Sequence, residues 1–177
     1  MVCVEDSFFN PRGYRMAEDR VELLKFAADR MLGKLAKWLR IIGQDVAYGS
    51  HLAGYGLIRT ARKEGRLILT CDRGIRKKSP PDYLLIESTQ FREQLKQVMD
   101  TYGLDPFKEA FTRCVECNSL LEPIPKDSVQ TKVPPYVFST QEKFSFCRQC
   151  QRVFWPATHL QKMLEELKGL GVGSRET

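Results

Sequence analysis

The segment Gly65-Arg-Leu-Ile-Leu-Thr-Cys-Asp-Arg73 is the clearest indication of the fold class. The residues after its first glycine form a short apolar run that ends at Asp72, which is typical of a strand buried inside a parallel sheet. Three more runs of this kind lie at Lys25–Ala28, Asp45–Tyr48 and Tyr83–Ile86. We interpret all four runs as short strands.

Segments with helical periodicity lie between and after these strands. Apolar residues recur every three or four positions in 31–42, in 57–62 and in 91–99. Gly43 ends the first of these segments and Gly65 ends the second. Strands that alternate with helices are typical of βαβ units, so the pattern predicts an α/β fold with a parallel sheet.

The composition is that of a globular protein. The chain has 177 residues, a net charge of +6, 42% hydrophobic residues and 28% charged residues, which excludes a disordered or fibrous chain. It has no apolar run of the roughly eighteen residues that a membrane helix needs. The first twenty residues carry several charges and no apolar run, so we expect no signal peptide. These features predict a cytoplasmic protein with no membrane partner.

The composition changes after Gly103. Residues 113–159 contain five prolines, four clustered cysteines and short β-rich pieces at Tyr136–Phe138, Phe144–Phe146 and Val153–Trp155. A short helix is expected over 160–168. The expected organisation is an extension (1–24), an α/β domain (25–111), a small β-rich domain (112–160) and a terminal helix with a tail (161–177).

Four of the six cysteines form two CxxC pairs, Cys114/Cys117 and Cys147/Cys150, with 29 residues between the pairs. A CxxC turn points two thiolates at one ion, and two such turns complete the four-thiolate shell of a structural zinc site. The alternatives are two disulfides, which a reducing compartment disfavours, or unpaired thiols. His159 lies nearby, and we interpret it as a surface or packing residue.

Three aspartates are associated with the ends of predicted strands. Asp29 follows the first strand, Asp45 opens the second and Asp72 follows the third. Residues just past the carboxyl ends of parallel strands share one edge of the sheet, and carboxylates gathered there repel unless a divalent cation binds. Mg²⁺ or Mn²⁺ in such a site suits phosphodiester chemistry. The alternative is that each aspartate caps a turn or helix, as expected for Asp29 in particular.

Basic residues surround these acids, with 14 Lys and Arg against 7 Asp and Glu between Lys25 and Glu93. One group shares a helix face and consists of Arg30, Lys34 and Lys37. The other directly follows Asp72 and consists of Arg73, Arg76, Lys77 and Lys78. A cationic rim around an acidic centre is what a metal-dependent nuclease needs, because the rim collects phosphates. For the first group, a solvated helix face is an equal alternative.

Several of these motifs resemble the Mut7-C family, a PIN-like ribonuclease domain with a C-terminal zinc ribbon. They are Asp29-Arg-Met-Leu-Gly-Lys-Leu-Ala-Lys-Trp-Leu-Arg40, the Gly65–Arg73 stretch, Arg113-Cys-Val-Glu-Cys-Asn118 and Cys147-Arg-Gln-Cys-Gln-Arg-Val-Phe-Trp-Pro-Ala-Thr-His159. The resemblance covers about residues 25–165. It implies a three-layer α/β sandwich over 25–111, a zinc ribbon over 112–160 and a metal-dependent site that cleaves RNA.

The resemblance also implies roles for single residues. Asp29 matches the first metal-binding aspartate of PIN-like domains, Asp72 matches the acid of the Thr-x-Asp motif, and Asp45 matches the aspartate after a Gly-x turn. The family usually has a further aspartate seven residues before an alanine, and Gly54 stands at that position here, with no acid from Val46 to Lys63. Cys71 replaces a common arginine.

Two functions are therefore expected. The first is an endoribonuclease that acts on single-stranded RNA with Mg²⁺ or Mn²⁺. The second, which Gly54 favours, is a non-catalytic RNA-binding module that keeps the zinc ribbon and the basic rim. A ribbon that binds other proteins, attached to a purely structural α/β domain, is a weaker third possibility.

Overall fold

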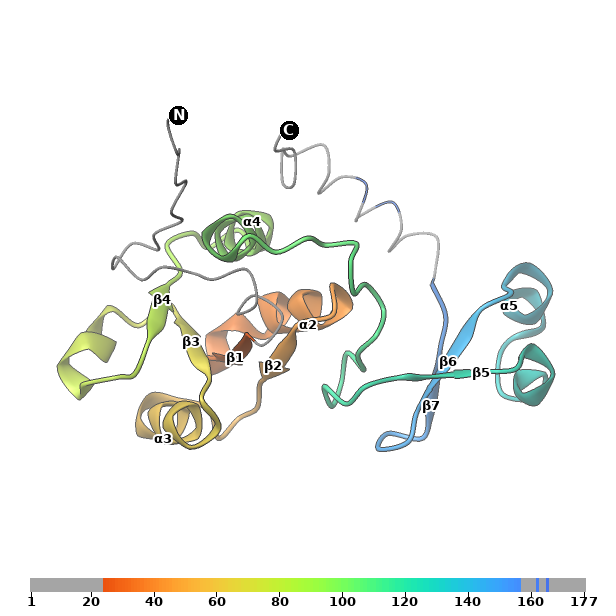
Figure 1. Cartoon of the computed structure of the whole chain (residues 1–177), viewed down its shortest axis with the longest axis horizontal. Coiled ribbons are helices and arrows are strands. Elements are labelled where there is room, and N and C mark those ends of the chain that lie inside the picture. Colours follow the sequence, from red (N-terminus) through yellow and green to blue (C-terminus); the bar gives the residue numbers. More distant parts are fainter. Residues whose placement is uncertain (1–23, 157–161, 163–164, 166–177) are drawn as a thin grey trace, which may run out of the picture.

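The computed structural model describes residues 24–156, 162 and 165. Four parallel strands form its main sheet in the order β2-β1-β3-β4 (Figure 1). Their bounds are β1 Lys25–Ala28, β2 Asp45–Ala47, β3 Leu67–Thr70 and β4 Tyr83–Leu85. The four predicted strands are thus confirmed, each to within about one residue at either end. The expected extension and His159 lie outside the described residues, as does the terminal helix apart from residues 162 and 165.

Helices cover both faces of this sheet. Phe26 and Ala28 of β1 pack in the cluster that contains the buried faces of α2 and α4, whereas Ala27 packs in the cluster of α3. This alternation is the two-residue period of a strand buried on both sides. The helices are α2 Gly33–Ile41, preceded by the 3₁₀ turn η1 Arg30–Leu32, then α3 Gly54–Glu64 and α4 Phe91–Tyr102. The result is the expected three-layer α/β arrangement (Figure 1).

The chain order creates a switch point in the sheet. From β1 the chain passes through α2 to β2 on one side, and from β2 it returns through α3 to β3 on the other side of β1. In open parallel sheets, ligands bind at the carboxyl ends of the strands between which the order reverses. The fold therefore predicts a ligand site at the carboxyl ends of β1 and β3.

A second, smaller sheet follows α4 and lies beside the β2 end of the first (Figure 1). It is antiparallel and joins β5 Glu122–Ile124, β6 Phe144–Cys147 and β7 Arg152–Phe154, with η3 Lys126–Val129 and α5 Pro135–Thr140 between β5 and β6. Its small core contains Val129, Val133 and Phe144. The strands predicted near Phe144–Phe146 and Val153–Trp155 are confirmed.

The prediction of a β-rich piece at Tyr136–Phe138 is wrong, because these residues lie in α5. Pro135 is the first residue of that helix. Proline is favoured there because its fixed φ suits a helix and its missing N–H has no partner in the first turn. The apolar triplet is too short for its period to distinguish a strand from a helix.

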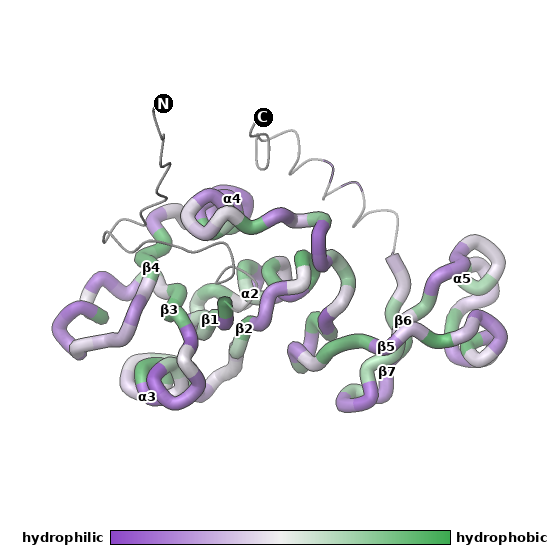
Figure 2. Tube along the Cα trace, in the orientation of Figure 1, coloured by the Kyte–Doolittle hydropathy of each residue, from purple (hydrophilic) through white to green (hydrophobic). Residues whose placement is uncertain are grey.

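Hydropathy follows the same layers. Apolar colour dominates β3 and parts of α2, while the loop that carries η2 (Arg73–Lys78) is mainly hydrophilic (Figure 2). In the described part of the chain, no helix combines the length and the apolar character needed to cross a membrane.

Candidate functional site

The carboxyl ends of β1 and β3 bring two of the predicted acids together. The backbone N–H of Asp29 donates to Leu69 O over 2.9 Å, so the residue after β1 is held on β3. Thr70 Oγ1, which is fully buried, donates to Asp29 Oδ2 over 2.8 Å and accepts from the Asp72 backbone N–H over 3.0 Å. One hydroxyl thus links both acidic residues at the switch point.

Asp29 is buried and does not act as a capping residue. It occupies the position before η1, but its side chain makes no capping hydrogen bond there. Its carboxylate accepts from Thr70 instead. The capping alternative raised by the sequence therefore does not account for Asp29.

Asp72 is exposed and does cap the turn that follows it. Its Oδ1 accepts from the Gly74 N–H over 2.8 Å, and Lys78 Nζ donates to its Oδ2 over 3.1 Å. These bonds, first from Lys78 and then from Gly74, hold the pKa of Asp72 below its usual range. The carboxylate already has a counter-cation of its own, which any metal ion would have to share or displace.

Asp45 does not join this pair, and the predicted three-carboxylate group is wrong. Asp45 pairs in register with Lys25, the first residue of β1, so it lies at the amino ends of the strands. Its carboxylate binds Arg66 at 2.5 Å and Asn118 at 2.8 Å. A residue that opens a parallel strand lies at the edge opposite to a residue that follows one, which explains the separation.

The interactions around Asp45 make it a structural ion. Burial raises its pKa, but hydrogen bonds from Arg66 and Asn118 outweigh burial and hold the pKa below the ordinary value. Arg113 adds a longer ion pair at 3.8 Å. Asp45 is therefore committed to partners that link β2 to the segment that carries Cys114 and Cys117.

The basic residues differ in how free they are. Arg73 and Lys77 are exposed and have no partner among the described residues, whereas Arg76 Nε donates to Tyr83 Oη over 3.0 Å. Lys34 Nζ lies 3.8 Å from the centre of the Phe91 ring, a cation–π contact. Arg30 is exposed next to Asp29. The basic residues of η2, here called the η2 cluster, thus lie beside Asp72: Arg73, Arg76, Lys77 and Lys78. Lys78 pairs with the Asp72 carboxylate.

Gly54 begins α3 with φ +51°, and a Cβ added to it would meet no atom within 4 Å. The loop before it lies near Asp29, because Arg30 N donates to Leu52 O over 3.2 Å. No group of three or more acids, histidines or cysteines that could hold a metal lies at this edge, within the described part of the chain. Of the three aspartates predicted for the site, this edge carries two, Asp29 and Asp72.

Sequence reasoning missed two features of this region. Thr70 links the two acidic residues, and its position two residues before Asp72 could have suggested this role. Three basic residues of α3 recur at helical spacing, which predicts that they share one face of the helix: Arg59, Arg62 and Lys63. Neither feature stands out in the sequence, because a threonine ending a strand and basic residues on a helix are both common.

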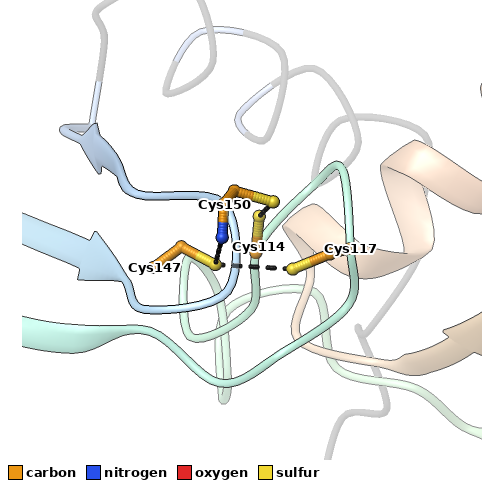
Figure 3. Close-up of side chains that lie close together, drawn as sticks. All are labelled: Cys114, Cys117, Cys147 and Cys150. Carbon is orange, nitrogen blue, oxygen red and sulfur yellow. Dashed lines mark hydrogen bonds between the residues drawn. The ribbon is translucent and has the colours of Figure 1, made fainter.

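The four paired cysteines form one cluster (Figure 3). Cys114 and Cys117 come from the loop before β5, Cys147 ends β6, and Cys150 lies in the turn to β7. All four Sγ atoms lie within 4.8 Å of one another, with Cys114–Cys150 at 3.8 Å and Cys117–Cys147 at 3.4 Å. A tetrahedral zinc with Zn–S bonds of about 2.3 Å needs sulfurs about 3.8 Å apart. The cluster therefore fits a metal ion such as zinc, and its cysteines are free thiols.

The cluster needs a cation to ionise fully. Burial raises the pKa of Cys117, but hydrogen bonds from Ser119 and the other cysteines lower it to about 6. Hydrogen bonding to Cys117 raises the pKa of Cys150 to about 12, and burial raises that of Cys114. Ionisation of one thiol thus disfavours ionisation of the next, as expected where like charges share a site.

The first CxxC turn is bonded to the α/β sheet through Arg40. Arg40 is 3% exposed; its Nη1 donates to Val115 O and Glu116 O, both at 2.8 Å, and its Nε and Nη2 donate to Val46 O. The Asn118 side chain accepts from Val46 N over 3.0 Å. These contacts join the cysteine cluster to α2 and β2.

A family model described as the Mut7-C RNAse domain matches residues 24–167. The match spans most of the chain and includes both the Asp29–Asp72 edge and the cysteine cluster, so the chain belongs to the Mut7-C RNAse domain family. This confirms the resemblance drawn from the sequence motifs. Neither the curated proteins nor the solved structures contain a significant match.

Proposed function

We propose that the chain is a metal-dependent ribonuclease that hydrolyses phosphodiester bonds of single-stranded RNA at the edge formed by Asp29 and Asp72. The observation that carries the proposal is the Thr70-linked pair of acids at the switch point of a chain from an RNAse family. Active sites of open parallel sheets lie at such points. The basic η2 cluster beside Asp72 supplies charge complementary to RNA.

Asp29 and Asp72 would hold one Mg²⁺ or Mn²⁺. The donors fit, because Mg²⁺ is commonly bound by one or two carboxylates together with waters and substrate phosphates. Such an ion activates water and stabilises charge on a phosphate. The chain's own residues orient the site: Thr70 holds the Asp29 carboxylate, and Lys78 and Gly74 hold that of Asp72. Arg73, Arg76 and Lys77 would bind phosphates of the substrate.

The second candidate is an RNA-binding module without catalysis. Two observations favour it: Gly54 stands where an acid would complete the centre, and the Lys78 ammonium already pairs with Asp72. Both features lower the affinity of this edge for a divalent cation. Under this alternative the basic rim is used only to bind RNA.

We also propose that the cysteine cluster holds a structural Zn²⁺ and that residues 112–160 form a zinc ribbon beside the α/β domain of 25–111. The four-sulfur geometry and the small size of the ribbon core support this, because so small a core needs a metal for stability.

Cleavage of a labelled single-stranded RNA with Mg²⁺ or Mn²⁺ tests the function. Asp29→Asn and Asp72→Asn should each lower the rate on the order of a hundred-fold or more, because each removes a metal ligand. Asp127→Asn, an exposed acid of η3, is the matched control and should cleave like the parent. A parent that binds RNA but cleaves it with neither metal would select the binding module instead.

A further inference from the structure

A hollow of about 600 Å³ lies along α3 and is separate from the Asp29–Asp72 edge. Among the described residues, its lining comes from that helix: Tyr55, Gly56, Ile58, Arg59, Arg62 and Lys63. Ile58 is buried, whereas the Tyr55 side chain is 73% exposed. An exposed aromatic ring thus shares one shallow, open surface with three cationic side chains, and its described lining contains no acid.

The charges of this hollow are available to a ligand. Arg59 and Lys63 are exposed and have no partner among the described residues. Arg62 is held differently, since its Nη2 donates to the backbone oxygen of Ser79, the residue that follows η2. This bond places the hollow next to the end of η2.

Two glycines fix where Tyr55 lies. Gly54 before it adopts φ +51°, a left-handed conformation that favours glycine. A Cβ on Gly56 after it would lie 2.4 Å from the backbone oxygen of His51, so that position excludes any side chain. The backbone after the tyrosine is therefore tightly packed against His51, although Tyr55 itself is exposed.

We propose that this α3 hollow is a second contact site for single-stranded RNA, in which a base stacks on Tyr55 while Arg59 and Lys63 bind phosphates. Exposed aromatic rings combined with a cationic groove are what single-strand binders use. The strand would run from the Asp29–Asp72 edge across η2 to α3. The inference rests on the proposed function for the identity of the ligand, but it requires no cleavage.

The test measures binding of a fluorescent single-stranded RNA to the full chain without divalent metal, over a series of salt concentrations. The double variant Arg59→Gln/Lys63→Gln should flatten the salt slope by about 1.4, because each phosphate that a side chain neutralises accounts for about 0.7 of that slope. Arg62 is left intact because it links α3 to η2. The charge-matched control is Lys25→Gln/Lys143→Gln, an exposed lysine of β1 and one of the loop before β6, and its slope should equal that of the parent.

Stacking is tested separately. Tyr55→Ala should weaken binding about five-fold or more, while Tyr55→Phe, which keeps the ring, should bind like the parent. If the double variant changes the slope no more than its control does, or if Tyr55→Ala binds normally, the α3 hollow is a solvated surface and the inference fails. A polyglutamate peptide that displaces RNA from the parent but not from the double variant, with no effect of Tyr55→Ala, would assign it to acidic proteins and also overturn the inference.

These outcomes are distinguishable from failure of the proposed function. A parent that cleaves RNA with Mn²⁺ while the α3 variants bind normally overturns only the second site. A parent that binds no RNA even at low salt overturns both.

Discussion

At the scale of single residues, the pairing of Lys78 with Asp72 is the feature that most affects the proposed metal centre. The lysine lies 3.1 Å from the carboxylate that would bind the cation, so the two positive charges compete. Lys78→Gln should therefore raise the affinity for Mn²⁺, by up to about five-fold, because exposed ion pairs contribute about 0.2–1 kcal/mol. Titration followed by the electron paramagnetic resonance of free Mn²⁺ measures this.

Lys77→Gln is the matched control for that experiment, since Lys77 is exposed and does not contact Asp72. It removes the same charge from the same turn and should leave Mn²⁺ affinity nearly unchanged. Equal gains in both variants would mean that only the general field of η2 matters, and weaker binding in Lys78→Gln would contradict the competition.

Gly54 tests whether the centre lacks one acid. Its surroundings leave space for a side chain, but φ +51° brings strain, which aspartate tolerates better than most residues. Gly54→Asp should cost about 1 kcal/mol of stability and raise the cleavage rate, measured with Mg²⁺ and Mn²⁺. Gly54→Asn carries the same strain without the charge and should not raise it. If Gly54→Asp folds normally and neither it nor the parent cleaves RNA, catalysis is excluded.

At the scale of elements, Asp45 and Arg40 link β2 and α2 to the first CxxC turn. Asp45→Asn removes a partly buried ion that accepts from Arg66 and Asn118, so we expect a loss of about 1.5–3 kcal/mol in the free energy of unfolding at pH 7. Urea unfolding measures the loss. RNA cleavage at a temperature where the variant is folded should be unchanged, because Asp45 lies at the opposite edge from Asp29.

The pH dependence of the Asp45 variant has a definite sign. The folded-state pKa of Asp45 is held below its unfolded value of about 3.9, so its contribution is complete above that value and disappears as pH falls through the folded pKa. The difference between parent and Asp45→Asn should therefore shrink in acid. A difference that grows below about pH 4 would contradict the structural role.

At the scale of the whole molecule, the cysteine cluster supports both sheets. If the first CxxC turn unfolds, the buried Arg40 guanidinium loses its acceptors at Val115 and Glu116. Removing the metal, or Cys117→Ser, should therefore lower the stability of the α/β sheet as well as that of the ribbon. Hydrogen exchange of β1 and β3 amides, with elemental analysis for one zinc per chain in the parent, measures this.

Cys71→Ser is the control for the cluster, because Cys71 is exposed and stands outside it. It should bind zinc and exchange like the parent. Unchanged protection of β1 and β3 in Cys117→Ser would show that the two sheets are energetically independent.

The strands, the main helices and the cysteine chemistry that depends on local spacing could be predicted from the sequence. Four apolar runs separated by segments of helical periodicity were sufficient to predict the parallel sheet, because a strand buried on both faces needs a continuous apolar run. The two CxxC turns predicted the cysteine cluster, because each turn positions two thiolates locally. The family followed from long, ordered motifs.

Which distant residues lie together could not be predicted from the sequence, because it depends on how the strands are ordered in the folded chain. Asp29 and Asp72 lie at one edge of the sheet and both bond to Thr70, because β1 and β3 are neighbours and parallel. Asp45 is excluded because it opens its strand and binds Arg66 and Asn118. The bonds of Arg40 to the CxxC turn link residues more than seventy positions apart, as do those of Asn118. Periodicity indicates the face of a strand or helix on which a residue lies. The order of the strands, and the edge of the sheet at which each strand ends, are set by the packing of the whole sheet.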